Sequence, residues 1–337
     1  MLDRTLTVRV ARIRRLTGDV SAFEFVHPWG RMLPRYRAGA HIDVHLPGGF
    51  TRQYSLALAD EAAPAAGAGP VCARYVIGVK REEAGRGGSA ALHERVREGD
   101  LLAISTPRNT FPLHAEARHH LLLAGGIGLT PLLAMAQQLQ RESAAFTLCV
   151  FARSRAHLAF AGELVALGAH VRLHFDEPTS GPQAQRLDLQ KLLRGDDPGT
   201  HLYLCGPEGF MQAVLTATSH WPEECVHLEY FAPPVAAGGA GSSTSDEPFT
   251  LVLAGRGIEV PVAADQSAVD ALHDLGIEVP TSCSQGVCGT CVVTLVPGPG
   301  SEPDHRDHCL TATERHSKVA LCCSRAKAGG RLVVGIS

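Results

Sequence analysis

The segment Cys283-Ser-Gln-Gly-Val-Cys288-Gly-Thr-Cys291 separates three cysteines by four and then two residues. This is the plant-type spacing for a [2Fe–2S] cluster, which takes its fourth thiolate from further along the chain. Small residues between the cysteines let backbone N–H groups turn toward the sulfurs and stabilise the reduced cluster. Zinc sites more often pair their thiolates in two Cys-x2-Cys knuckles, and no second knuckle follows. The spacing therefore favours an iron–sulfur cluster over zinc or buried structural cysteines.

Three later cysteines are candidates for the fourth thiolate. Cys309 follows His305 and His308 in a polar loop, which we expect to be solvated rather than a metal site of its own. Cys322 and Cys323 end a short apolar run that we expect to form a strand. In a strand, only one of two neighbours faces the cluster. The residues alone leave all three candidates open.

Length and composition limit the classes of protein to which the chain can belong. With 337 residues, 45% of them hydrophobic and 19% charged, the chain is long enough for two or three globular domains. Its formal net charge of −3 gives no reason to expect a nucleic-acid partner. We see no apolar run of membrane-spanning length and no signal segment, and ten cysteines fit a reducing compartment. We therefore expect a cytoplasmic protein.

The first third of the chain consists of short runs that alternate between apolar and polar residues. Several short strands with little helix predict a small antiparallel β-barrel, which we assign to residues 1–113. One helix is expected near residues 87–96, where Gly87, Gly88 and Ser89 place free N–H groups for an anion. The expected strands are residues 6–14, 20–26, 40–46, 52–58 and 71–80.

From about residue 114 the pattern changes to alternating strands and helices, which predicts a parallel α/β sheet over residues 114–232. An apolar strand runs into Gly125-Gly-Ile-Gly-Leu-Thr-Pro131 and then a helix, with Thr130 as N-cap and Pro131 at the first helical position. Later strands are expected at residues 146–151, 170–175, 201–205 and 226–231, and later helices at residues 156–167, 187–193 and 208–218.

The rest of the chain is expected to be a tether and a third domain. Residues 233–247 are dominated by Pro, Gly and Ser, which is typical of a flexible linker. Residues 248–337 begin with a hairpin around Gly255-Arg-Gly and a helix that starts at Ser267 and stops at Gly276. Together with the cysteine segment, this predicts an α+β ferredoxin-like domain of the β-grasp type.

Three further motifs are weak alone, and two of them are informative by position. The glycines at 125, 126 and 128 join the first parallel strand to its helix, where a pyrophosphate meets helix N–H groups. Cys205-Gly-Pro207 ends a later strand of the same sheet and so lies at the same edge, although a buried core cysteine is the plainer alternative. Arg52-Gln-Tyr-Ser55, taken in isolation, is an ordinary strand.

Taken in their order along the chain, with the cysteine segment last, the motifs resemble the ferredoxin–NADP reductase family. They are most similar to its phthalate dioxygenase reductase type, which includes the vanillate demethylase reductases. The resemblance covers essentially the whole chain and extends to His305-Arg-Asp307 and Cys322-Cys-Ser-Arg-Ala326. It implies an FMN-binding barrel, an NAD-binding domain and a C-terminal ferredoxin domain. It also implies that the fourth ligand stands two residues before Ser-Arg-Ala, which completes the set Cys283, Cys288, Cys291 and Cys322.

The resemblance implies how FMN binds. Tyr54 would lie against the isoalloxazine ring, the catalytic Ser55 would bond near N5, and Arg52 would hold the phosphate. FMN is expected rather than FAD because an adenine-binding extension is not evident. The expected FMN contacts are Arg52, Gln53, Tyr54, Ser55, Val79, Lys80, Gly87, Gly88, Ser89, Thr130 and Phe231, the last in the sequence Glu229-Tyr-Phe231.

The same resemblance implies that the catalytic Cys205 lies beside the nicotinamide of NADH. NADH is expected rather than NADPH, although Arg153 and Arg155 follow a strand end where they can accommodate a 2′-phosphate. The expected NAD contacts are Gly125, Gly126, Gly128, Thr130, Arg153, Cys205, Gly206 and Pro207.

The implied function is an NADH-dependent FMN and [2Fe–2S] oxidoreductase. A hydride from NADH would reach FMN, and single electrons would pass through the cluster to a Rieske-type terminal oxygenase, either a demethylase or a ring-hydroxylating dioxygenase. Two alternatives stay open: a reductase for a heme monooxygenase, and a non-enzymatic electron carrier or redox sensor.

Overall fold

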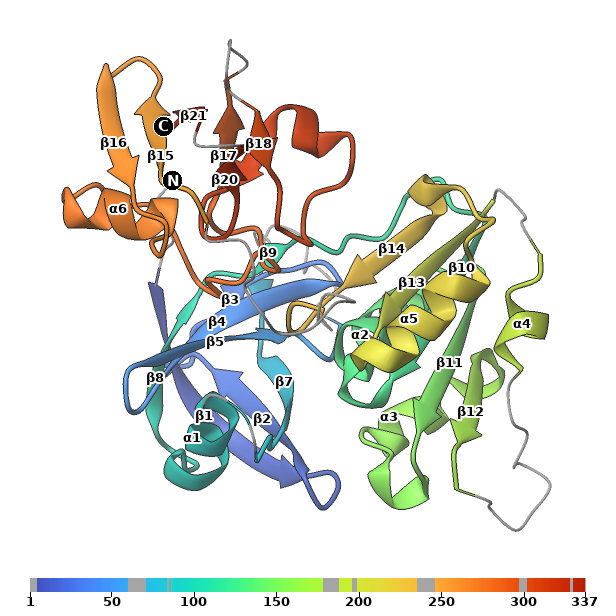
Figure 1. Cartoon of the computed structure of the whole chain (residues 1–337). Helices are drawn as coiled ribbons and strands as arrows, with labels where there is room; N and C mark the ends of the chain where they lie inside the picture. Colours follow the sequence, from blue (N-terminus) through green and yellow to red (C-terminus); the bar gives the residue numbers. More distant parts are fainter. Residues whose placement is uncertain are drawn as a thin grey trace. The chain divides into compact units, whose positions relative to one another are not determined.

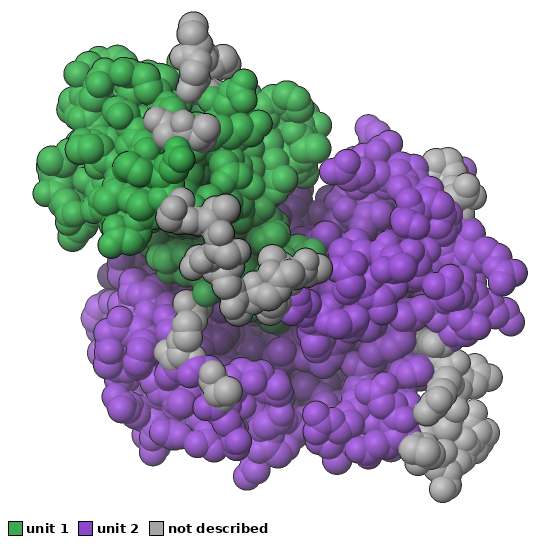
Figure 2. All heavy atoms as spheres, viewed as in Figure 1, with its two compact units in different colours: residues 1–2, 230–337 green, residues 3–229 purple. Residues whose placement is uncertain are grey.

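The computed structural model divides the chain into two compact units, Asp3–Glu229 and Tyr230–Ser337, the second with Met1–Leu2 assigned to it (Figure 2). It describes residues 5–59, 71–83, 85, 87–177, 188–195, 199–234, 246–296, 302–327 and 330–336. Most of the expected tether, residues 235–245, lies outside the described residues. No helix among the described residues is long and apolar enough to cross a membrane.

The first part of the Asp3–Glu229 unit is a nearly closed antiparallel barrel with the strand order β5-β4-β8-β1-β2-β7 (Figure 1). A bridge between Leu56 and Ile77 links the two edges. The strands are β1 (Thr5–Arg15), β2 (Val20–Val26), β4 (Ala40–Leu46), β5 (Phe50–Ser55), β7 (Tyr75–Lys80) and β8 (Leu101–Ser105). Short β9 (Arg108–Asn109) pairs with β4, and β3 (Leu33–Pro34) pairs with β6 (Val71–Cys72).

The alternation seen in the sequence explains the barrel. Ala40, Ile42, Val44 and Leu46 on β4 lie in the barrel core, while the residues between them face the other way. The β4–β5 turn contains Gly48 at φ 93 and Gly49 at φ 79, conformations that favour glycine. Helix α1 (Gly88–Arg95) follows Gly87 at φ 80, close to the expected bounds.

The second part of this unit is a five-stranded parallel sheet with the order β12-β11-β10-β13-β14. Helix α2 packs against β10, β11 and β13. The strands are β10 (His119–Gly125), β11 (Phe146–Ala152), β12 (Val171–Phe175), β13 (Thr200–Cys205) and β14 (Val226–Glu229). The helices are η1 (Gly126–Gly128), α2 (Leu129–Arg141), η2 (Arg155–His157), α3 (Ala161–Ala166), η3 (Gly168–His170), α4 (Leu189–Leu192), α5 (Glu208–Ala217) and η4 (Glu223–Cys225). The predicted antiparallel barrel and parallel sheet are therefore confirmed.

Several expected bounds in the sheet domain are wrong. Helix α2 has Gly128 at its N-cap, so Thr130 and Pro131 lie inside its first turn, because Gly126 at φ 53 allows a tight 3-10 turn to lead directly into the helix. The helix expected at 156–167 is shorter. Phe160 takes a left-handed conformation, φ 55, that places its buried ring against Gly78 of the barrel and delays α3 to residue 161. Strand β14 ends at Glu229 rather than residue 231.

The Tyr230–Ser337 unit has the predicted β-grasp arrangement. Its five-stranded sheet has the order β16-β15-β21-β17-β19, with β15 and β21 parallel and the other pairs antiparallel. Helix α6 (Ala268–Asp274) begins with a capping box between Ser267 and Asp270, and Gly276 follows at φ 72. The strands are β15 (Phe249–Leu253), β16 (Ile258–Val262), β17 (Val292–Leu295), β19 (Lys318–Ala320) and β21 (Arg331–Gly335), with a small ladder of β18 (Pro303–Asp304) and β20 (Arg325–Ala326), and η5 (Glu314–His316).

Candidate functional site

The loops after β10 and β13 meet where the strand order of the parallel sheet reverses, the usual position of a ligand crevice. The backbones touch there. A Cβ added at Gly128 would lie 2.3 Å from the Cys205 carbonyl oxygen and 2.6 Å from Gly206 N, and one at Gly206 would lie 2.9 Å from Gly125 Cα. The structure thus brings together the two glycine-containing segments that were expected to bind NADH.

A hydrogen-bonded carboxyl joins this crevice to the barrel. Glu229 lies beside Cys205 in the β13–β14 register, and the Ser55 hydroxyl at the end of β5 donates to Glu229 Oε2 at 3.0 Å. Burial raises the pKa of Glu229 to about 7, against the opposing effect of the Ser55 hydrogen bond. Burial, and then the charge of Glu229, hold the pKa of the Cys205 thiol well above its usual value. Both predicted catalytic residues therefore lie next to a carboxyl that can be protonated near neutral pH.

Sequence reasoning missed Glu229. The signal in the sequence is a carboxylate at the C-terminal end of the short strand Val226–Glu229. The functional motifs follow the C-terminal ends of other strands of the same sheet. A carboxylate there needs a partner or a raised pKa.

Arg52 and the N-terminus of α1 converge on one place. A Cβ at Gly88 would lie 2.4 Å from Arg52 Cγ, so the arginine side chain crosses the Gly87–Gly88 turn directly. The Arg52 guanidinium carbon lies 5.2 Å from the centroid of the Phe50 ring. Among the described residues, no side chain caps α1, so its first N–H groups are placed to meet an anion. A guanidinium beside a helix N-terminus fits a phosphate.

The other expected FMN residues of the barrel differ in what they can reach. Gln53 and Ser55 share one face of β5, and among the described residues Gln53 Nε2 is buried without a hydrogen-bond partner. Tyr54 packs against the barrel core, and burial raises its pKa. Val79 is itself a core side chain, and its carbonyl oxygen lies 3.0 Å from His93 Nε2. Lys80 pairs with Glu82.

Two further expected contacts, Ser89 and Thr130, have local partners. The Ser89 hydroxyl accepts the Glu82 N–H at 3.1 Å. The Thr130 hydroxyl donates to the Ile127 carbonyl at 3.1 Å, and its methyl lies 2.8 Å from where a Cβ of Gly78 would be, which gives Thr130 a packing role between barrel and sheet.

Two expected contacts are exposed. Arg153 is exposed after β11. Phe231 is 47% exposed and belongs to the Tyr230–Ser337 unit, so its position over a flavin stays a prediction.

The four predicted cluster ligands lie among five cysteines that interact in two groups. The Cys283 thiol interacts with the Cys288 thiol and raises its pKa, while Cys291, Cys322 and Cys323 belong to one packed group. Among the described residues, no three His, Cys, Asp or Glu side chains are gathered so as to hold one metal ion. A binuclear cluster takes four thiolates, two on each iron, and these neighbouring thiols can supply them.

The backbone of the cysteine loop points toward the sulfurs, as the small residues predict. Gln285 N donates to Cys283 Sγ at 3.3 Å, and Thr290 N donates to Cys288 Sγ at 3.5 Å. These directions require left-handed residues, which are Ser284 at φ 53, Gly286 at φ 72 and Gly289 at φ 72.

Two expectations about the later cysteines are corrected. Strand β19 ends at Ala320, so Cys322 and Cys323 lie in a turn and the alternation argument does not apply to them. Cys323 also faces the cysteine loop, since a Cβ at Gly286 would lie 2.6 Å from its Sγ. The segment around Cys309 is only partly solvated, because Asp307 is 1% exposed. Cys322 as fourth ligand stays a prediction.

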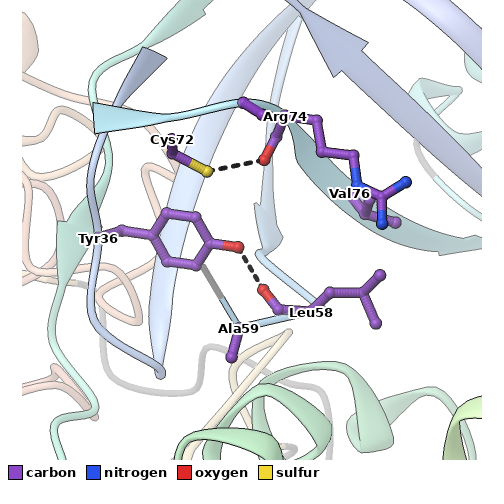
Figure 3. Close-up of a pocket in the computed structure, with 7 residues that line it drawn as sticks. Tyr36, Leu58, Ala59, Cys72, Arg74 and Val76 are labelled. Atoms are coloured by element: carbon purple, nitrogen blue, oxygen red, sulfur yellow. Dashed lines mark hydrogen bonds between the residues drawn. The ribbon is translucent and has the colours of Figure 1, made fainter. Parts of the chain in front are cut away.

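A pocket elsewhere on the barrel is unrelated to these motifs (Figure 3). Its polar groups bond to one another: the Tyr36 hydroxyl donates to the Leu58 carbonyl, and Cys72 Sγ donates to the Arg74 carbonyl at 3.0 Å. None of the expected site residues lines it. The lining residues are Tyr36, Leu58, Ala59, Cys72, Ala73, Arg74 and Val76.

Known proteins resemble the chain over its full length. The tert-butanol monooxygenase / tert-amyl alcohol desaturase reductase subunit of Aquincola tertiaricarbonis is 43% identical, covering 98% of this chain and 96% of that protein. A vanillate O-demethylase oxidoreductase of a Pseudomonas species is 42% identical, covering 96% and 97%. The solved structure of phthalate dioxygenase reductase, described as a modular structure for electron transfer from pyridine nucleotides to [2Fe–2S], matches with a TM-score of 0.68 at 35% identity and covers 98% of both chains. The chain belongs to the phthalate dioxygenase reductase family.

Domain models and a second structure add detail to this family assignment. The 2Fe-2S iron-sulfur cluster binding domain matches residues 251–327 of the reductase, and the N-terminal domain of dimethylamine monooxygenase subunit DmmA-like proteins matches residues 104–222. An intact type IV self-sufficient cytochrome P450 monooxygenase matches with a TM-score of 0.83 at 34% identity. The match covers 98% of the reductase but only 41% of that P450 chain.

Proposed function

We propose that this reductase takes a hydride from NADH and passes electrons singly through a [2Fe–2S] cluster to an oxygenase. The observation that carries the proposal is the contact of Ser55, Glu229 and Cys205 where the barrel meets the nucleotide crevice. Bound FMN would supply the conversion from a two-electron donor to a one-electron acceptor. The proposed domains are residues 1–113, 114–232 and 248–337, with the tether at 233–247.

Different residues would bind the flavin, place the nucleotide and hold the proton. Arg52 and the α1 N-terminus would hold the flavin phosphate. The touching loops at Gly128 and Cys205 would place the nucleotide against the Ser55 side of the barrel. Glu229, bonded to Ser55, would hold or release a proton at the Ser55 hydroxyl as charge on the neighbouring cofactor changes.

Absorbance and cofactor release test the proposal. Purified protein should show flavin and [2Fe–2S] absorbance together, heat should release FMN rather than FAD, and NADH should bleach both chromophores. Protein with a cluster but without flavin would instead support the electron-carrier alternative.

The variant Glu229→Gln tests the proton step. Glu229, with a pKa of about 7, is protonated below that pH and ionised above it, so the rate of flavin reduction by NADH should change through pH 6–8 in the parent protein. The glutamine cannot titrate, so we expect a flat profile and a rate lowered at least about tenfold. Stopped-flow flavin reduction measures both. The control is Glu224→Gln, at an exposed position. An unchanged pH profile in Glu229→Gln would show that Glu229 does not hold the proton.

Nucleotide preference is a separate prediction. We expect kcat/KM for NADH to exceed that for NADPH at least about tenfold, because the family resemblance favours NADH and Arg155 is already engaged, its guanidinium carbon lying 5.7 Å from the Phe175 ring. Steady-state rates with the two nucleotides decide it. Higher kcat/KM with NADPH, lost in Arg153→Ala, would assign the opposite preference.

We infer the electron acceptor from the family relatives. Full-length similarity to oxygenase reductases supports an oxygenase as electron acceptor, and we infer the Rieske type from the phthalate and vanillate relatives. The match to a self-sufficient P450 favours heme as the second candidate. Cluster reoxidation can be followed with a purified Rieske oxygenase or a purified heme monooxygenase as the sole acceptor. Faster reoxidation by the heme protein would reverse the assignment.

A further inference from the structure

Asp307 is a buried carboxylate in the Tyr230–Ser337 unit to which the proposed function gives no role. Its side chain is fully enclosed, with 0% exposure. Oδ2 lies 3.6 Å from Arg315 NH2 and accepts the Leu310 N–H at 2.9 Å, while Oδ1 lies 3.5 Å from His305 Nδ1. A carboxylate taken out of water this completely costs stability unless its surroundings compensate it.

The surrounding groups offset the cost of burying the Asp307 carboxylate only in part. Among the described residues, three buried atoms of the group have no hydrogen-bond partner: Asp307 Oδ1, His305 Nδ1 and Arg315 Nε. Arg315 NH2 instead donates to the Asp307 backbone carbonyl at 2.6 Å, and its side chain is 37% exposed. The countercharge is therefore partly in solvent while the carboxylate is not, and the negative charge acts mainly on the interior.

The interior that Asp307 faces is the cysteine loop. A Cβ at Gly286 would lie 3.0 Å from Asp307 Cα and 3.4 Å from Asp307 Cβ, and His308 N donates to the Gly286 carbonyl at 2.8 Å. The Cys309 thiol lies 3.9 Å from Asp307 Oδ2. Gly286 stands between Cys283 and Cys288, so the carboxylate adjoins the segment that carries the first pair of thiols.

We propose that Asp307 is a positioning residue for the iron–sulfur centre, which holds the segment 305–310 against the cysteine loop and keeps the reduction potential of the cluster low. The proposal rests on the proposed function, because it requires a [2Fe–2S] cluster at the four cysteines. One-electron reduction adds a negative charge to the cluster. A fixed negative charge nearby opposes that addition, whereas hydrogen bonds to the sulfurs favour it.

The variant Asp307→Asn removes the charge and keeps an oxygen that can accept the Leu310 N–H. We expect the midpoint potential of the cluster, measured by spectroelectrochemical titration of the full-length protein, to move to a more positive value, with the [2Fe–2S] absorbance retained. Asp304→Asn is the matched control, because Asp304 is 43% exposed and pairs with Arg306, so its loss should leave the potential unchanged.

The variant Arg315→Gln should shift the midpoint potential of the cluster in the opposite direction. It removes the positive charge beside Asp307, so the potential should move to a more negative value, and this test holds even if Asp307→Asn fails to fold. Equal potentials in the Asp307, Arg315 and Asp304 variants, or shifts of one sign in the first two, would overturn the proposal. Parent protein without [2Fe–2S] absorbance would instead refute the proposed function.

Discussion

Cys288→Ser should abolish the [2Fe–2S] absorbance and stop electron transfer to a one-electron protein acceptor such as cytochrome c, while NADH still reduces the flavin. Cys288 is 5% exposed, its thiol interacts with the Cys283 thiol, and its Sγ accepts the Thr290 N–H, so its loss removes one of the three thiols of the cysteine loop. The hydroxyl of serine is a far weaker iron ligand than a thiolate. We expect cytochrome c reduction to fall at least about a hundredfold. Absorbance spectra and the two rates provide the measurement.

A pair of neighbouring cysteines gives a sharp control. Cys322→Ser should behave as Cys288→Ser does, because Cys322 lies in the same buried group as Cys291 and holds the position, two residues before Ser-Arg-Ala, that the family resemblance gives the fourth ligand. Cys323→Ser should retain the cluster, although this thiol lies equally close in sequence and faces Gly286. Loss of the cluster in Cys323→Ser with retention in Cys322→Ser would make Cys323 the fourth ligand. Full cytochrome c reduction by a cluster-free Cys288→Ser protein would contradict the order of electron transfer.

Gly128→Ala should nearly eliminate the reaction with NADH. The new methyl would lie 2.3 Å from the Cys205 carbonyl oxygen, and both partners are backbone, so no side chain can rotate away. The loops after β10 and β13 must separate, which costs about 1–3 kcal/mol of folding free energy. We expect kcat/KM for NADH to fall at least about a hundredfold, since a displacement near 1 Å is sufficient for such a loss.

Gly209→Ala is the matched control for this change. Gly209 lies in the first turn of α5, two residues after Pro207, and a Cβ there meets nothing within 4 Å. Alanine should leave kcat/KM unchanged and raise the melting temperature slightly, because it favours helix. Similar kinetics in Gly128→Ala and Gly209→Ala would show that the contact between the two loops does not position the nucleotide.

Periodicity and short-range spacing made most of the fold predictable. The β4 alternation and the turn glycines 48 and 49 determine the barrel hairpin locally, and the capping box at Ser267 determines the start of α6. The conformation of the cysteine loop was equally predictable, because its left-handed residues and the N–H groups that point to the sulfurs lie within nine positions. Such features depend on neighbours in sequence.

The features that were missed depend on distant contacts. Phe160 leaves helical geometry because its ring packs against Gly78, which no local propensity reveals. Asp307 reads as an ordinary polar loop residue, and only its packing against Gly286 makes it a buried charge. Glu229 similarly acquires its raised pKa only through the burial that the folded sheet and barrel produce.

The Ser55–Glu229 hydrogen bond spans 174 positions of the chain. During synthesis the barrel therefore leaves the ribosome well before β14, and domains generally fold as units from the N-terminus. A nascent chain with a finished barrel still lacks the carboxyl partner of Ser55. The same holds for any fragment that ends before residue 229, so the hydrogen bond that joins the barrel to the sheet forms only with the last strand of the sheet.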